Sequence, residues 1–199
     1  MRKSTIKLTK HELDFASDTI YPETKQSVML KMRELFAECG QKLNQNVLYQ
    51  ELTQNGQFKI TKGEQYKGLP YLVLDCPQIK GSDFDWVART MFWWGHYISC
   101  NLIIRTDMLE PKKQASALHQ LKKTRILTGH NLWEQELESD AYSKLSDLSI
   151  VDITHILQDN TYLKISRKIA LRKHARLPEI TNIIYSEWFT ALGIKKGAD

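Results

Sequence analysis

Residues 90–106, TMFWWGHYISCNLIIRT, form the most strongly apolar stretch of the chain and constrain its fold more than any other feature. Two adjacent tryptophans, a histidine and a tyrosine lie close together in it. Aromatic and β-branched residues in a long run are typical of a central strand of a sheet. We therefore expect one extended strand across the middle of the fold, which either fills the core or lines a pocket.

The two sides of this expected strand differ, because alternate side chains of a strand point to opposite faces of the sheet. The even-numbered side chains are mostly apolar, so we expect them to face the core. They are Phe92, Trp94, His96, Ile98, Cys100, Leu102 and Ile104. The odd-numbered side is mixed and consists of Met91, Trp93, Gly95, Tyr97, Ser99, Asn101, Ile103 and Arg105. Gly95 is the expected position of a bulge or bend, and a bulge there would exchange the two faces upstream of it.

Shorter strands are expected on both sides of this stretch. Phe58 and Ile60 alternate with polar residues, and residues 69–75 (LPYLVLD) form a second apolar run after the turn-rich segment KGEQYKG. Together with residues 90–106 they predict a hairpin with a longer loop and then a meander over residues 58–106. A fourth strand is expected near residues 162–171, where apolar side chains alternate again. Arg167 falls on the apolar side of that strand, which indicates an end, an edge or a pocket there.

Helical patterns precede the meander. Thr9 and Glu12 have the spacing of a capping box, which predicts the start of a first helix. A second helix is expected from Pro22 to about Gly40, and residues 47–52 predict a further helical turn.

Helical patterns also follow the meander. They are expected from Pro111, from Asn131, after a second capping box at Ser149 and Asp152, and from Pro178 to Gly193.

Separate runs of helices and strands favour the α+β class over strict βαβ alternation. We expect a single domain over residues 1–199, with N-terminal helices at 9–52, the β-meander at 58–106 and a C-terminal helical part with one strand at 110–193. The predicted architecture is an antiparallel sheet of about four strands covered by helices, mainly on one face.

Composition excludes several classes of protein. The apolar fraction of 42% and charged fraction of 26% are typical of folded cytosolic proteins. The basic N-terminus has no apolar run behind it, so it is no secretory signal, and no segment reaches the ~20 apolar residues of a spanning helix. We therefore expect a cytoplasmic protein with no membrane partner.

Motifs for cofactors, metals and nucleophiles are missing from the sequence. There is no GxGxxG, P-loop or GxSxG pattern, and the six histidines show no metal-binding spacing. Three widely spaced cysteines indicate buried thiols and neither a disulfide framework nor a zinc site. We therefore predict no cofactor, no metal and no catalytic residue.

A pocket beside the long strand is the leading functional hypothesis. Trp93, Tyr97, Asn101 and Arg105 recur on the odd-numbered side, and Asp75 could add a polar wall. Aromatic side chains with a few polar groups commonly line small-molecule pockets. This predicts a non-catalytic small-ligand-binding or interaction domain. The alternative is that the same side chains pack beneath helices and bond to the backbone.

A basic run at residues 164–176 supports nucleic-acid binding as an alternative. Its cations are Lys164, Arg167, Lys168, Arg172, Lys173 and Arg176. A second basic zone at residues 112–125 would have to merge with it into one face, because phosphate binding needs gathered charge. A solvated, charge-protected strand edge explains the same residues.

Two further hypotheses come from other classes. An enzyme would need Asp75, His96 or Arg105 to converge in one cleft. An interaction protein would form a homodimer through an apolar strand edge or through the last helix.

Overall fold

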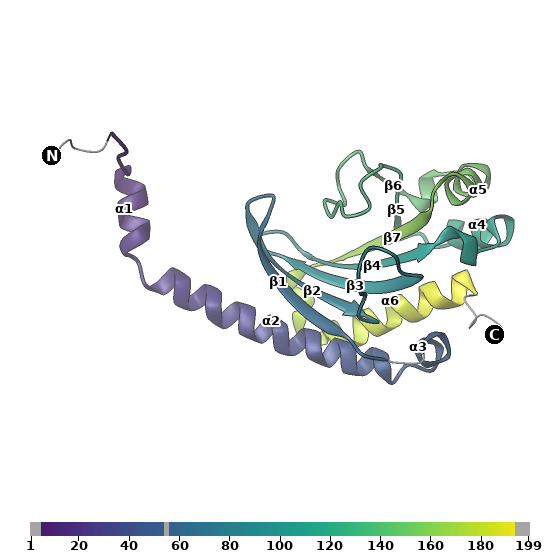
Figure 1. Ribbon diagram of the computed structural model, residues 1–199, viewed down its shortest axis with the longest axis horizontal. Coiled ribbons are helices and arrows are strands. Elements are labelled where there is room, and N and C mark those ends of the chain that lie inside the picture. Colours follow the sequence, from purple (N-terminus) through teal and green to yellow (C-terminus); the bar gives the residue numbers. More distant parts are fainter. Residues whose placement is uncertain (1–4, 54–55, 194–199) are drawn as a thin grey trace.

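The strands of the protein form one antiparallel sheet. The computed structural model describes residues 5–53 and 56–193, and the strands in these residues are ordered β1-β2-β3-β4-β7-β5-β6 (Figure 1). Their bounds are β1 Lys59–Tyr66, β2 Leu69–Cys76, β3 Trp86–Trp93, β4 Ile98–Arg105, β5 Arg125–Leu127, β6 Tyr142–Lys144 and β7 Tyr162–Ile169. The α+β class with a single antiparallel sheet is confirmed. The expectation of about four strands is wrong, since the sheet has seven.

Residues 90–106 are two strands and not one. β3 and β4 are joined by a tight turn at Gly95, in which the His96 N–H donates to the Trp93 carbonyl oxygen at 3.1 Å. Gly95 has a φ of 75° and is the third of the four turn residues, the position at which a type II turn requires a positive φ. The chain therefore reverses where the sequence predicted at most a bulge.

The assignment of the two faces is nevertheless confirmed for the strand residues, but the expectation that His96 faces the core is wrong, because His96 lies in the turn and is exposed. Phe92 pairs with Ile98, so paired residues of β3 and β4 are both even or both odd, and cross-strand partners share a face. The even-numbered Phe92 and Ile98 belong to the main core beneath the sheet. The odd-numbered Trp93 and Tyr97 belong to a second apolar cluster on the other face.

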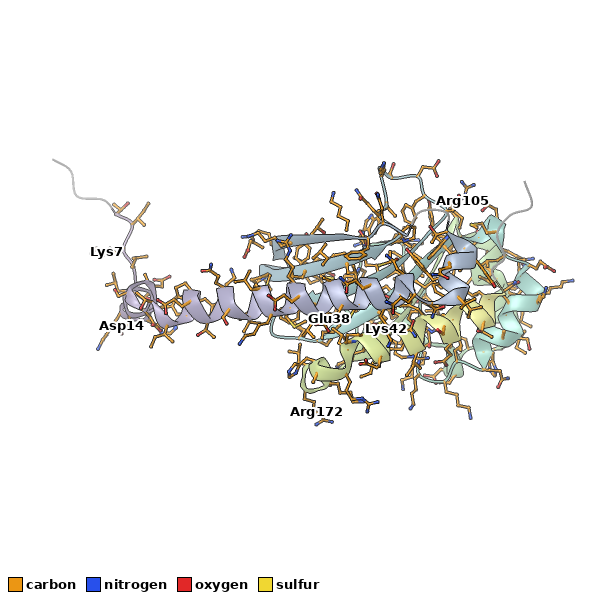
Figure 2. All side chains as sticks on the ribbon, turned by 90° about the horizontal axis from the view of Figure 1, so that it is seen from below. Lys7, Asp14, Glu38, Lys42, Arg105 and Arg172 are labelled. Atoms are coloured by element: carbon orange, nitrogen blue, oxygen red, sulfur yellow. The ribbon has the colours of Figure 1, made fainter. Side chains whose placement is uncertain are left out.

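All the helices except the first cover the even-numbered face. The helix bounds are α1 Lys10–Ser17, α2 Ile20–Asn44, α3 Val47–Leu52, α4 Pro111–His119, α5 Ile150–Asp159 and α6 Leu177–Leu192. Three short 3-10 segments lie at Thr106–Met108, Leu145–Asp147 and Leu171–Arg176. Figures 1 and 2 show α2 and α6 running side by side across this face, and both contribute large buried side chains such as Phe36 and Trp188. Both predicted capping boxes are present, at Thr9 for α1 and at Ser149 for α5.

Two helix predictions are wrong for identifiable reasons. The second helix continues through Gly40 to Asn44. Gly40 does not end the helix, and a glycine is needed there because the Phe58 side chain packs against it. A Cβ at Gly40 would lie 2.7 Å from Cδ1 of Phe58, the residue before β1. Only glycine therefore lets the Phe58 ring pack this closely against α2. The helix expected from Asn131 does not form. Residues 128–141 are an irregular loop that covers the odd-numbered face of the sheet.

The β1-β2 hairpin is tighter than expected. Lys67 and Gly68 are its two turn residues, with φ values of 49° and 77°. Positive φ at both central positions defines a type I′ turn, whose twist matches that of the flanking strands. The longer loop predicted for KGEQYKG is therefore mostly strand.

Candidate functional site

A row of polar side chains crosses the middle of the odd-numbered face. Asp75, Arg89, Asn101 and Ser166 are register partners on β2, β3, β4 and β7. Arg89 donates to both carboxylate oxygens of Asp75, at 2.6 and 2.9 Å. The Ser166 hydroxyl donates to the Asn101 side-chain oxygen at 2.7 Å, and the Asn101 amide donates to the Arg89 carbonyl oxygen at 3.2 Å. The row is a continuous hydrogen-bonded chain across four strands.

The loop of residues 128–141 closes over this row. Lys164 is only 1% exposed, and its ammonium donates to the carbonyl oxygens of Leu132 and Glu134 at 2.9 and 2.6 Å. Burial, followed by the nearby charge of Arg89, lowers the pKa of Lys164 to about 7. The Arg89 guanidinium lies 4.5 Å from the centre of the Trp133 ring. Lys164 of β7 and Arg89 of β3 therefore hold the loop against the odd-numbered face of the sheet.

The same loop is anchored at the end of the sheet near the Gly95 turn. The Tyr97 hydroxyl donates to the Gln135 carbonyl oxygen at 2.9 Å and accepts from the Leu137 N–H at 2.8 Å. Burial raises the pKa of Glu134, but bonds from the Glu136 N–H and other donors outweigh it and lower the pKa to about 2. The Glu134 carboxylate is thus held ionised within the loop.

The predicted pocket residues share one face, but they do not all meet. Asp75, Trp93, Tyr97 and Asn101 are buried beneath or beside the loop. Arg105 lies at the far end of β4, where it forms ion pairs with Asp107 and Asp83. A ligand site among these residues stays a prediction, and it requires residues 128–141 to move.

The residues proposed for an enzyme are dispersed. His96 is exposed in the Gly95 turn, where it stacks on Trp93 with ring centres 3.5 Å apart. Arg105 lies nine residues further along an extended strand, about 30 Å away. Asp75 forms an ion pair with Arg89. The structure does not bring these three side chains together.

The basic run is split by the alternation of β7. Lys164 and Lys168 face the loop, whereas Arg167 faces the helices and pairs with Glu187 of α6 at 2.7 Å. The remaining cations, Arg172, Lys173 and Arg176, are exposed on the 3-10 segment that follows β7. Lys164 is buried and cannot contact a phosphate backbone in this conformation.

Part of the run does form a pocket of about 360 Å³ with residues from the second basic zone. β5 pairs only with Ile165 and Ser166 of β7, so residues 167–169 border an open edge on that side. Five cations line the pocket: Lys123, Arg125, Arg167, Lys168 and Lys173. Three isoleucines of α6 also line it: Ile180, Ile183 and Ile184. We call this hollow the basic pocket.

Charge in the basic pocket is only partly neutralised. Arg167 pairs with Glu187, and Lys168 pairs with Glu138 at 2.8 Å. Lys123, Arg125 and Lys173 have no ion-pair partner within residues 5–53 and 56–193. The Arg167 Nε is a buried donor without an acceptor in the same part of the chain. The pocket therefore presents a surplus of positive charge beside an apolar wall.

The sequence indicates the basic residues of this pocket but not the strand that brings them together. Lys123 and Arg125 lie in the second basic zone, and Arg167 falls on the apolar side of the strand expected near residues 162–171. That strand is β5, which has three residues and is too short to show alternation in the sequence. Only the pairing of β5 with β7 brings the two basic zones together.

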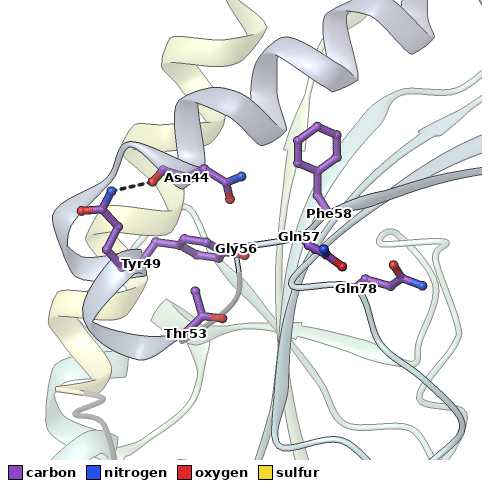
Figure 3. A pocket seen from close by; sticks show the side chains of 8 residues that line it. Asn44, Tyr49, Thr53, Gly56, Gln57, Phe58 and Gln78 are labelled. Atoms are coloured by element: carbon purple, nitrogen blue, oxygen red, sulfur yellow. Dashed lines mark hydrogen bonds between the residues drawn. The ribbon is translucent and has the colours of Figure 1, made fainter.

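A larger hollow of about 710 Å³ lies between α3 and the start of β1 (Figure 3). Its walls are uncharged: Asn44, Tyr49, Gln50, Thr53, Gly56, Gln57, Phe58 and Gln78. The Gln50 amide donates to the Asn44 carbonyl oxygen at 2.8 Å, the bond drawn in Figure 3. This hollow offers hydrogen bonds but no charge, so it provides less discrimination than the basic pocket.

Neither metal nor thiol chemistry is indicated in the described part of the chain. No group of three or more His, Cys, Asp or Glu side chains there could hold a metal ion. Burial raises the pKa of Cys39 and of Cys100 to about 12, so both remain protonated thiols at neutral pH. Among the described helices, none has the length and apolar character needed to cross a bilayer.

No family model matches this chain, and no curated protein or solved structure shows significant similarity to it.

Proposed function

We propose that this protein is a non-catalytic binding domain whose ligand is a small anion with an apolar portion, held in the basic pocket. The observation that carries the proposal is the set of three unpaired cations, Lys123, Arg125 and Lys173, beside the isoleucines of α6. A carboxylate or phosphate would take the charge, and an alkyl or aromatic part would cover the isoleucines.

Magnitudes explain why the ligand needs both parts. An exposed ion pair contributes only about 0.2–1 kcal/mol, so three such contacts alone give weak binding. Each buried CH₂ adds about 0.8 kcal/mol, and Ile183 is exposed and available to be covered. A ligand with a charged head and a short apolar tail is therefore expected to bind in the micromolar to millimolar range.

Matched amphiphiles test the proposal. Isothermal titration calorimetry at low salt would compare octanoate and octyl phosphate with octanol and with inorganic phosphate. Both octyl anions should bind more tightly than the neutral alcohol and the bare ion. Equal binding of octanol would show that charge makes no contribution and would remove the proposal.

Paired variants locate the site. The double variant Arg125→Gln/Lys173→Gln should weaken octyl phosphate binding about tenfold, the loss of 1.4 kcal/mol in binding free energy. The control Lys80→Gln/Lys112→Gln removes the same charge at exposed positions outside the pocket and should leave affinity unchanged. Equal losses in both variants would mean that diffuse surface charge binds the anion and that the pocket does not.

Nucleic-acid binding is the second candidate, since the basic pocket joins Lys123 of one basic zone to Lys173 of the other. It is less well supported because Lys164 is buried and because Arg167 and Lys168 already pair with carboxylates. A mixed-sequence oligonucleotide that binds more tightly than octyl phosphate, with affinity that falls steeply as salt rises, would favour it.

A further inference from the structure

The N-terminal arm, residues 5–24, projects from the body of the protein. It comprises α1 and the first turn of α2, and Figures 1 and 2 show it extending well beyond the sheet. Six of the fourteen exposed large apolar side chains in the described residues lie on it. They are Ile6, Leu8, Leu13, Phe15, Ile20 and Tyr21.

Helix α1 lacks the packing that would stabilise it within one copy of the chain. It has eight residues, and none of them is buried. Isolated helices shorter than about 12–15 residues are marginal in water, even with favourable composition. The capping box at Thr9 satisfies its first amides but buries no apolar surface. A stable α1 therefore requires a surface to pack against.

A groove of suitable character lies between α2 and the edge strand β1. Its volume is about 520 Å³, and its apolar walls include Met29, Leu30, Ile60 and Leu72. A second hollow shares Leu30 and Ile60 with it and continues along α2 toward Phe58. Among the strands of residues 5–53 and 56–193, β1 has a partner on one side only, so the groove lies at an open edge of the sheet. We call the first of these two hollows the α2-β1 groove.

The arm and the groove carry opposite charge. The arm has two lysines, Lys7 and Lys10, and four carboxylates: Glu12, Asp14, Asp18 and Glu23. The groove is lined by three cations, Lys25, Arg33 and Lys62, and by the single carboxylate of Glu64. An arm seated in such a groove would bury apolar side chains and place its carboxylates near basic ones.

The connection between the two helices holds α1 away from the groove of its own chain. Only Asp18 and Thr19 separate α1 from α2. The Asp18 carboxylate accepts from the Ile20 N–H at 2.8 Å, and the Phe15 and Tyr21 rings lie with centres 4.8 Å apart. These contacts fix the bend at the junction, and α2 itself forms one wall of the groove.

We propose that two copies of this chain associate, with the arm of each copy seated in the α2-β1 groove of the other. The same surface then serves on both subunits, which is the requirement of a closed twofold dimer. One arrangement covers the exposed side chains of both arms and fills both grooves. The inference is independent of the basic pocket, which lies beside β7, four positions from β1 in the strand order.

Sedimentation velocity of the full chain over a wide concentration range tests the proposal. The wild type should shift from monomer to dimer as concentration rises. Leu13→Gln/Ile20→Gln should weaken the dimer at least about tenfold, and Arg33→Glu should weaken it by reversing a charge of the groove. Both sets of side chains are exposed in one copy, so the thermal stability of the monomer should not change. The control Ile150→Gln/Val151→Gln changes two exposed apolar residues at the start of α5 and should dimerise like the wild type.

Hydrogen exchange distinguishes the second copy from other ways of covering the arm. The amides of α1 should exchange more slowly as protein concentration rises. A monomer at every concentration would overturn the proposal, as would a dimer that survives both the arm and the groove variants. A monomer whose α1 amides are equally protected at all concentrations would also overturn it, because the arm would then dock on its own chain.

Discussion

Replacing Lys164 by methionine should abolish one specific dependence of stability on pH. Lys164 is buried under residues 128–141, and its pKa is lowered to about 7 from 10.5 by burial and by the nearby charge of Arg89. Between these two values the unfolded chain binds a proton that the folded chain does not. The free energy of unfolding therefore rises with pH in this window, and below pH 7 the contribution levels off because both states hold the proton.

The size of the effect follows from the same values. The slope approaches about 1.4 kcal/mol per pH unit once the folded lysine is neutral, which gives an increase of about 2 kcal/mol between pH 7 and about pH 8.5. Measurements should stop there because Cys39 and Cys100 act in the opposite direction. Burial raises the pKa of each thiol to about 12 from 9.0, so above about pH 9 the unfolded chain loses these protons first and stability falls.

Urea unfolding followed by tryptophan fluorescence measures this dependence. The wild type should gain stability from pH 7 to about pH 8.5, whereas Lys164→Met should show a flatter profile. Lys168→Met is the matched control, because Lys168 points to the same face of β7 but is exposed and pairs with Glu138. It should keep the wild-type slope. Parallel profiles for wild type and Lys164→Met would refute the reasoning, since burial of Lys164 would then contribute nothing to the pH dependence.

Two further predictions concern packing and the polar row. Gly40→Ala should destabilise the fold by about 1–3 kcal/mol, because its Cβ would overlap the Phe58 ring, although alanine is the better helix former. The double variant Gly40→Ala/Phe58→Ala should show a smaller penalty than the two single changes predict, and simple additivity in urea unfolding would contradict the clash. Asp75→Ala should cost up to about 3–5 kcal/mol by leaving the charge of the partly buried Arg89 without its partner. Asp75→Ala/Arg89→Met should recover part of that loss, and thermal unfolding that shows no recovery would argue against a paired role.

The sequence predicted the faces of the sheet better than its connections. Alternation depends only on which side of a strand is apolar, and a three-residue loop around Gly95 preserves that parity across the turn. The turn itself was missed because Trp94 and His96 resemble strand residues and Gly95 is its only sequence marker. Local signals such as the capping boxes at Thr9 and Ser149 were read correctly, since they involve residues three apart.

Features that depend on distant pairing could not be predicted. The strands β5 and β6 have three residues each, which is too few to show a period. The basic pocket depends on how far β5 extends along β7, and no residue pattern encodes that length. Lys164 looked like one member of a basic run, and only the loop above it turns it into a buried group.

The position of β7 has a consequence for synthesis on the ribosome. β7 is the last strand to be translated, yet it lies between β4 and β5 in the sheet. Until residues 162–169 have emerged, the nascent chain exposes the open edge of β4, a surface prone to aggregation. The short β5-β6 hairpin has no sheet to join before that moment. Any truncated product that ends before Tyr162 would keep the open edge of β4 and leave the β5-β6 hairpin without a sheet to join. The shortest fragment able to complete the sheet must therefore extend through Ile169.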